Sequence, residues 1–201
     1  MSAPLRCEAI SWPQVDRLLI EVAGKIRGDA FRPDAVVAIA RGGFVPARLL
    51  CDHLGVMELA SFRIEHYRGQ QMREQARIRH PLSMDVRKKS ILIVDDLSDT
   101  GETFEVAVRH LRELGAAEVR TMALHYKQQS KFEPDYYSRR IMKWRWLSYP
   151  WARMEDVVEL TRGLERPWGD AAAIAARLRA RHGLRVPART VEEALACMSE
   201  Q

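Results

Sequence analysis

Short apolar runs alternate with longer amphipathic segments over most of the sequence. Runs at 35–40, 56–62, 91–94 and 119–124 have the length and apolar content of buried strands, and 136–147 also has β character. Helices are predicted at 11–28, 44–54 and 103–114, the first with apolar residues at helical spacing. Continuous apolar runs are typical of strands that are covered on both faces. The alternation therefore predicts an α/β fold with a parallel sheet, flanking helices and right-handed crossovers.

The pattern changes after about residue 155, where Ala- and Arg-rich helical segments follow. A helix is predicted over 170–182, ending at Gly183. Residues 190–193, Thr-Val-Glu-Glu, have the form of a capping box and predict the start of a last short helix. We expect one domain over 1–154 and a helical C-terminal extension over 155–201, packed on the core or on a second subunit.

Composition narrows the class of protein. A chain of 201 residues can form one sizeable α/β core with a small appendage. The net charge is +5, but the basic residues are spread along the chain, which favours an enzyme for polyanionic substrates over a nucleic-acid binder. Three cysteines without CxxC spacing indicate a reducing compartment. No apolar run has the length of a membrane span and no signal pattern opens the sequence, so we expect a cytoplasmic protein without a membrane partner.

The clearest chemical signal follows the apolar run 91–94. Asp95 and Asp96 come directly after it, where open α/β sheets bind ligands and carboxylates can accept hydrogen bonds from sugar hydroxyls. Residues 99–103, Asp-Thr-Gly-Glu-Thr, offer backbone N–H groups, two hydroxyls and a helix start to a phosphate. The segment predicts a polyol-binding acid pair beside an anion cradle.

A second loop, Arg41-Gly42-Gly43, follows the apolar run 35–40. Its two glycines let the backbone approach a ligand closely. The next helix directs its N-terminal N–H groups at the same place, and Arg41 supplies a fork of donors suited to phosphate oxygens.

The segment 91–103 resembles the motif with which type I phosphoribosyltransferases bind phosphoribosyl pyrophosphate (PRPP): a hydrophobic strand, two acids and D-T-G-x-T. The resemblance covers about residues 34–151. It implies the parallel-sheet fold of that family, with flanking helices and a mobile hood hairpin over about 63–81. The implied reaction is Mg²⁺-dependent transfer of the phosphoribosyl group from PRPP to a 6-oxopurine (xanthine, guanine or hypoxanthine), giving a nucleoside monophosphate and pyrophosphate.

The resemblance also implies roles for residues that contact PRPP. The Arg-Gly-Gly loop, which in the family often holds a non-proline cis peptide, would bind pyrophosphate together with the hood, whose candidates are Tyr67, Arg68 and Gly69. Asp95 and Asp96 would hold ribose hydroxyls and help to hold Mg²⁺, which PRPP oxygens carry. The residues expected at the 5′-phosphate are Asp99, Thr100, Gly101, Glu102 and Thr103.

Base recognition is implied by two further matches. A lysine in the place of Lys127 donates to the C6 oxygen in 6-oxopurine enzymes, and an acid in the place of Asp99 approaches N7 and handles its proton. Residues 146–151 resemble the W-x-x-x-P-W segment of the xanthine-guanine enzymes. Trp146 is the candidate that stacks on the base, and backbone carbonyls near Leu147 and Asp156 could read the C2 substituent. The neighbouring Trp144 and Trp151 are predicted to be core aromatics.

Three departures leave the nucleobase open: the N-terminal helix, the sequence Tyr-Lys-Gln-Gln around Lys127 in place of Lys-Pro, and the long tail. The alternatives are a phosphoribosyltransferase for another base and a PRPP-sensing regulator without turnover. Asp95, Asp96 and Asp99 are all present and no helix-turn-helix pattern is obvious, which favours the enzyme. We expect PRPP and a nucleobase as partners, no nucleic acid, and a homodimer or larger homo-oligomer by analogy with the family.

Overall fold

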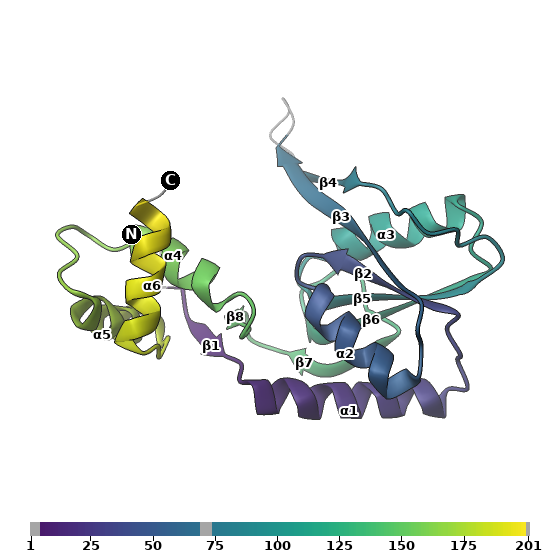
Figure 1. Cartoon of the computed structure of the whole chain (residues 1–201), viewed down its shortest axis with the longest axis horizontal. Coiled ribbons are helices and arrows are strands. Elements are labelled where there is room, and N and C mark those ends of the chain that lie inside the picture. Colours follow the sequence, from purple (N-terminus) through teal and green to yellow (C-terminus); the bar gives the residue numbers. More distant parts are fainter. Residues whose placement is uncertain (1–4, 69–73, 200–201) are drawn as a thin grey trace. The chain divides into compact units, whose positions relative to one another are not determined.

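The computed structural model describes residues 5–68 and 74–199 (Figure 1). They form two compact units. The first comprises residues 15–143, and the second combines the described residues before 15 with those from 144 onward. Within the described residues, no helix is long and apolar enough to cross a membrane.

The first unit contains a six-stranded sheet in the order β4-β3-β2-β5-β6-β7. Every neighbouring pair is parallel except β3–β4, which is antiparallel, so the predicted parallel α/β fold is confirmed. The strands are β2 (Ala35–Ala40), β3 (Leu59–Arg68), β4 (Glu74–His80), β5 (Ser90–Ser98), β6 (Glu118–Lys127) and β7 (Tyr136–Ile141). The helices are α1 (Trp12–Gly28), of which residues from Val15 onward belong to this unit, α2 (Phe44–Leu54) and α3 (Glu102–Glu113).

Chain direction explains which face each helix covers. The connection from β2 through α2 leads outward to β3, whereas β5 through α3 leads the opposite way to β6. Right-handed crossovers in opposite directions place their helices on opposite faces. Figure 1 shows this arrangement, with α3 on one face and α1 and α2 on the other. The loops that follow β2 and β5 therefore diverge, which is where open α/β sheets bind ligands.

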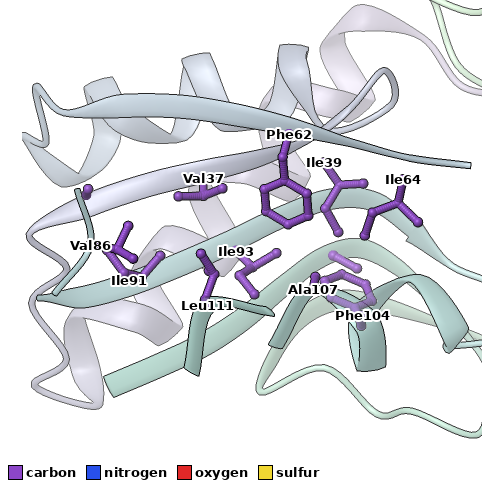
Figure 2. Packing of buried hydrophobic residues seen from close by; sticks show 12 residues of the cluster. Val37, Ile39, Phe62, Ile64, Val86, Ile91, Ile93, Phe104, Ala107 and Leu111 are labelled. Atoms are coloured by element: carbon purple, nitrogen blue, oxygen red, sulfur yellow. The ribbon is translucent and has the colours of Figure 1, made fainter. Parts of the chain in front are cut away.

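One hydrophobic core of this unit lies between the sheet and α3 (Figure 2). Alternate residues of the central strands, such as Val37 and Ile93, face Phe104 and Leu111 of α3 and are almost fully buried. On α1, the apolar positions predicted from helical spacing are buried as well. At the start of α1, Oε1 of Gln14 accepts hydrogen bonds from the backbone N–H and the hydroxyl of Ser11, each at 2.8 Å.

The second unit is mainly helical. A short strand β1 (Cys7–Ala9) pairs in parallel with β8 (Trp146–Ser148). The helices are α4 (Arg153–Arg162), α5 (Ala171–His182) and α6 (Ala188–Ser199), which surround a separate apolar cluster containing Val157, Ile174, Leu178 and Val191. Asp170 caps α5 by accepting a hydrogen bond from the N–H of Ala173 at 2.8 Å.

Several predicted boundaries differ from the structure. The strand expected at 56–62 is β3, which begins at Leu59 and runs on to Arg68 because β4 pairs with its second half. The segment 136–147 is divided between β7 and β8, which belong to different sheets. The capping-box prediction is wrong, since α6 already begins at Ala188 and the N–H of Thr190 donates to the carbonyl of Pro187.

The division between the two compact units falls between residues 143 and 144 in this part of the sequence. The reason is strand pairing: β8 pairs with β1 and not with the six-stranded sheet, so residues 144–154 join the helical segment. The apolar cluster of that segment includes Leu5 and Cys7. A family domain that ends at 154 stays a prediction.

Candidate active site

Asp95 and Asp96 lie within β5 and not after it. Pairing between β2 and β5 ends at Ala38 and Val94, whereas β6 accompanies β5 to its last residue, Ser98. The acids therefore stand where β5 loses one of its two neighbours, and both are half-buried. The position was expected at the strand end; the structure corrects it because β6 keeps the backbone extended beyond the acids.

The loop after β2 contacts this acid pair. A Cβ atom added at Gly42 would lie 2.6 Å from Oδ1 of Asp96, and one at Gly43 would lie 2.7 Å from the carbonyl oxygen of Ile39. Backbone leaves no room for a side chain at Gly43, and at Gly42 the Asp96 carboxylate would have to move, which explains the two adjacent glycines. The peptide bond between Ala40 and Arg41 is cis, as the resemblance implied, and Arg41 is exposed.

Electrostatics favour a ligand that gives positive charge or hydrogen-bond donors to the acids. Burial raises the pKa of Asp95 well above its ordinary value, and the neighbouring Asp96 carboxylate raises it further. The N–H of Asp96, 2.9 Å from Oδ1 of Asp95, lowers this pKa in part. Carboxylate oxygens suit both sugar hydroxyls and Mg²⁺, so the donor set fits the implied metal. Across the described residues, no group of three or more metal-binding side chains comes together.

The predicted phosphate loop lines a hollow of about 210 Å³ between β5 and the start of α3. Gly101 precedes α3 with φ of 90°, and a Cβ there would lie 2.5 Å from Cβ of Phe132. The lining residues are Leu97, Ser98, Asp99, Thr100, Gly101, Thr103 and Phe104. Glu102 opens α3, and its N–H lies 3.4 Å from Oγ1 of Thr100. The N-cap residue, Gly101, has no side chain to cap this helix start, and binding of the 5′-phosphate here stays a prediction.

The loop after β6 braces the phosphate loop. The hydroxyls of Ser98 and Ser130 lie 3.0 Å apart, and the N–H of Lys131 donates to the carbonyl of Thr100 at 3.0 Å. Phe132 stacks on Phe104, with ring centroids 5.5 Å apart. Sequence reasoning missed Ser130 and Phe132, because nothing in their spacing marks a contact with a loop thirty residues earlier.

Lys127 and Asp99, both predicted to contact the base, contact each other. The ammonium of Lys127 lies 2.7 Å from Oδ2 of Asp99, and its side chain is only 2% exposed. The amide of Gln129 donates to the other oxygen of Asp99 at 3.1 Å. Lys127 and Gln129 therefore hold Asp99 from both of its carboxylate oxygens. The sequence pattern assigned no role to Gln129, which it showed only as part of the departure from Lys-Pro.

The hood region is a hairpin. Strands β3 and β4 pair antiparallel from Ile64 and Ile78 out to Arg68 and Glu74, so the predicted hairpin is present. Gly69 lies outside the described residues, and so do the side chains of Tyr67 and Arg68. The expected contact of Arg68 with pyrophosphate stays a prediction.

Trp146 belongs to the second unit, whereas Lys127 belongs to the first. Its indole Nε1–H donates to Oδ1 of Asp156 at 2.8 Å, and the ring is half-buried. The next residue, Leu147, is buried. Trp151 stacks on the ring of Tyr149, but it is half-buried and does not belong to the fully buried core that was predicted for it.

The prediction for Trp144 is wrong. Its side chain is 45% exposed, because it lies in the connection between β7 and β8, outside both sheets. Trp144 is therefore not a core residue.

Comparison with known proteins identifies the family. The family model described as "Phosphoribosyl transferase domain" matches residues 10–153. This chain belongs to the phosphoribosyltransferase family. The xanthine-guanine phosphoribosyltransferase of Ruegeria sp. is 30% identical over 168 residues, which cover 78% of this chain and 91% of the relative.

Solved structures similar to this chain include a member of this family. The purine phosphoribosyltransferase from Pyrococcus horikoshii is 36% identical, with a TM-score of 0.65, and the match covers 72% of this chain and 93% of that one. A protein from Neisseria gonorrhoeae with bound ppGpp is 25% identical, with a TM-score of 0.64 and coverage of 75% and 91%. The type I phosphoribosyltransferase fold is thus established for this chain.

Proposed function

We propose that this phosphoribosyltransferase transfers the phosphoribosyl group of PRPP to a 6-oxopurine base. The observation that carries the proposal is the convergence of three segments at the carboxyl ends of β2, β5 and β6. The Gly42 loop meets Asp96, the phosphate loop follows, and Lys127 pairs with Asp99 beside that loop. The purine enzymes among the relatives support the choice of acceptor.

PRPP would be held along its length by residues of the first unit. The 5′-phosphate would bind at the start of α3 in the hollow that contains Thr100 and Thr103, where N–H groups and hydroxyls favour an anion. Ribose hydroxyls would donate to Asp95 and Asp96. Arg41, exposed beside Gly42, would bind the pyrophosphate together with Arg68 of the hood.

Mg²⁺, when bound, neutralises charge on the departing pyrophosphate, and Asp95 and Asp96 would help to hold it. A cation beside the pair would counteract the effect of burial and of Asp96 on the pKa of Asp95 and favour its ionised form. The acids would also stabilise positive charge that develops on the ribose as the leaving group departs.

The base would be oriented by Lys127 and Asp99. Lys127 would donate to the C6 oxygen, which selects an oxygen over an amino group because an amine would face another donor. The bond from ribose C1 to N9 forms as the bond from C1 to the pyrophosphate oxygen breaks, and the proton on N7 passes to Asp99. Trp146 would stack on the purine, and backbone carbonyls near Leu147 and Asp156 would face C2.

The test is steady-state release of pyrophosphate with PRPP, Mg²⁺ and a panel of bases. We expect kcat/KM for xanthine, guanine or hypoxanthine to exceed that for adenine by at least about 100-fold. Equal efficiency with adenine, or a preference for a pyrimidine, would contradict the proposal. PRPP binding without turnover of any base would instead support a PRPP-sensing regulator.

A second candidate property is inhibition by ppGpp, a guanosine nucleotide with two diphosphate groups. The Neisseria protein with bound ppGpp supports it, as does the pair of anion-binding loops around Asp95. We infer that ppGpp competes with PRPP. A rise in apparent KM for PRPP with unchanged maximal rate would agree, whereas inhibition that PRPP cannot overcome would contradict it.

Location and assembly complete the proposal. The cysteines of the described chain, Cys7, Cys51 and Cys197, are all free, which supports a cytoplasmic protein in a reducing compartment. A homodimer or larger assembly is proposed from analogy with type I relatives.

A further inference from the structure

We propose that Asp156 is a positioning residue for the indole of Trp146, and that the helical extension thereby sets affinity for the base. This inference rests on the proposed function, because it takes Trp146 as the residue that stacks on the purine. It assigns a role to a segment beyond the family match, which ends at residue 153.

The carboxylate of Asp156 holds two side chains of β8. Its Oδ1 accepts from the indole Nε1 of Trp146 at 2.8 Å, and its Oδ2 accepts from the hydroxyl of Ser148 at 2.5 Å. Residues 146 and 148 project from the same side of the strand, because successive side chains alternate. One buried carboxylate therefore fixes both the ring and the strand that carries it.

Burial makes these hydrogen bonds strong constraints. Asp156 is 4% exposed, and burial raises its pKa, while the bonds from Ser148 and Trp146 and the charge of Arg153 act to lower it. A buried carboxylate is stable only when its oxygens accept hydrogen bonds, so rotation of the indole away from Asp156 would be costly. The ring of Trp146 is consequently held in one orientation.

The extension in turn holds Asp156. It lies in the first turn of α4, next to Val157, which is fully buried among residues of α5 and α6 such as Leu178 and Val191. Arg153 at the start of α4 donates to the carbonyls of Ile10 and Ser148, each at 3.0 Å. The helical cluster thus provides a rigid support for β8, within a single compact unit.

A fixed ring favours stacking, because binding then orders no side chain. If Asp156 acts by orienting the indole, its loss should weaken base binding and leave PRPP binding intact. If Asp156 only stabilises the unit, its loss should lower the melting temperature without this selective effect. The two roles therefore differ in which KM changes.

The experiment compares full-length variants in the presence of PRPP, Mg²⁺ and the preferred 6-oxopurine. For Asp156→Ala we expect KM for the base to rise about tenfold, with KM for PRPP within about twofold of wild type. Asp156→Asn keeps an acceptor for the indole and should recover most of the base affinity. In a Trp146→Phe background, which lacks the Nε1 donor, Asp156→Ala should add no further change.

Asp170→Ala is the matched control, since it removes a cap from α5 in the same unit but contacts neither Trp146 nor Ser148. It should lower stability and leave both KM values unchanged. Tryptophan fluorescence gives a second readout that needs no turnover. The contribution of Trp146 is the part of the emission that Trp146→Phe removes, and its wavelength should shift in Asp156→Ala and not in Asp170→Ala.

Two results would overturn the role of Asp156: an unchanged KM for the base in Asp156→Ala, or an equal rise in Asp170→Ala. An unchanged Trp146 fluorescence contribution in Asp156→Ala would overturn the contact itself. If the wild-type protein turns over no purine, the proposed function and the role of Asp156 are both contradicted. If the wild-type protein turns over the purine and the Asp156 variants have the same KM for the base, only the role of Asp156 is contradicted.

Discussion

The ammonium of Lys127, buried at the end of β6, lies 2.7 Å from the carboxylate of Asp99 in the loop after β5. The partners are unequally exposed, because the Asp99 side chain is 39% accessible and that of Lys127 only 2%. Water can replace Lys127 at Asp99, whereas little water can replace Asp99 at Lys127. Loss of Asp99 should therefore destabilise the protein more than loss of Lys127.

This asymmetry predicts different costs for removing each partner. Asp99→Ala should lower the free energy of unfolding by about 2 kcal/mol, because it leaves a buried ammonium without its carboxylate, although partial hydration keeps the cost below that of fully buried pairs. Lys127→Met keeps the buried stem and should cost less than about 1 kcal/mol, although both variants should lose 6-oxopurine transfer. Urea unfolding measures both values, and a larger cost for Lys127→Met would contradict the asymmetry.

Asp95 is expected to lower the stability of the folded protein while it contributes to PRPP binding. Its folded-state pKa is raised, so the folded protein binds more protons than the unfolded chain between the ordinary and the raised value, and stability falls as pH rises through that window. Asp95→Asn removes this penalty. It should raise the melting temperature at pH 8 by about 2–4 °C, with the gain fading toward pH 4. It should lower kcat/KM for PRPP about 100-fold.

The exposed Asp16 on α1 gives the control, since Asp16→Asn should change neither property. The measurement is thermal unfolding at several pH values, taken as the difference between variant and wild type. A gain for Asp95→Asn that is the same at pH 4 and pH 8 would show that ionisation of this carboxyl is not its cause.

Three glycines should respond differently to replacement by alanine. At Gly42 the new methyl group meets the Asp96 carboxylate, which can rotate, so KM for PRPP should rise more than stability falls. At Gly43 it meets backbone of Ile39 and Val94, which cannot move, and unfolding should become easier by about 3 kcal/mol. Gly24, with nothing within 4 Å, should gain about 0.5–1 kcal/mol from alanine in α1.

Circular dichroism melts and PRPP kinetics on the three variants test this order. Equal destabilisation at Gly42 and Gly43 would mean that Asp96 is as immobile as the backbone.

The helical extension should contribute to stability through its own core. Leu178→Ala, at a fully buried position in α5, should lower the free energy of unfolding of that unit by about 2–5 kcal/mol, whereas Leu114→Ala, at an exposed position after α3, should cost far less. Truncation after Arg153 should lower the melting temperature or dissociate the proposed oligomer. Thermal unfolding and sedimentation measure these effects, and a truncated protein with unchanged melting temperature and unchanged mass would contradict the prediction.

The sequence by itself determined the elements and the chemistry of each loop. The apolar run 91–94 and the spacing of Val15 to Ile26 require a buried strand and an amphipathic helix, because burial follows local periodicity. The segment 99–103 likewise leads into the helix that its sequence predicts. These features depend on neighbours in sequence, so the sequence was enough to predict them.

Only the tertiary structure decided which residues meet. The pairing of Lys127 with Asp99, the contact of Gly42 with Asp96 and the hold of Asp156 on Trp146 join separate elements. The exposure of Trp144 and the early start of α6 were likewise invisible in local patterns, which predicted otherwise. Strand order and helix packing set these outcomes, because contacts between distant segments depend on how the whole chain closes around its cores.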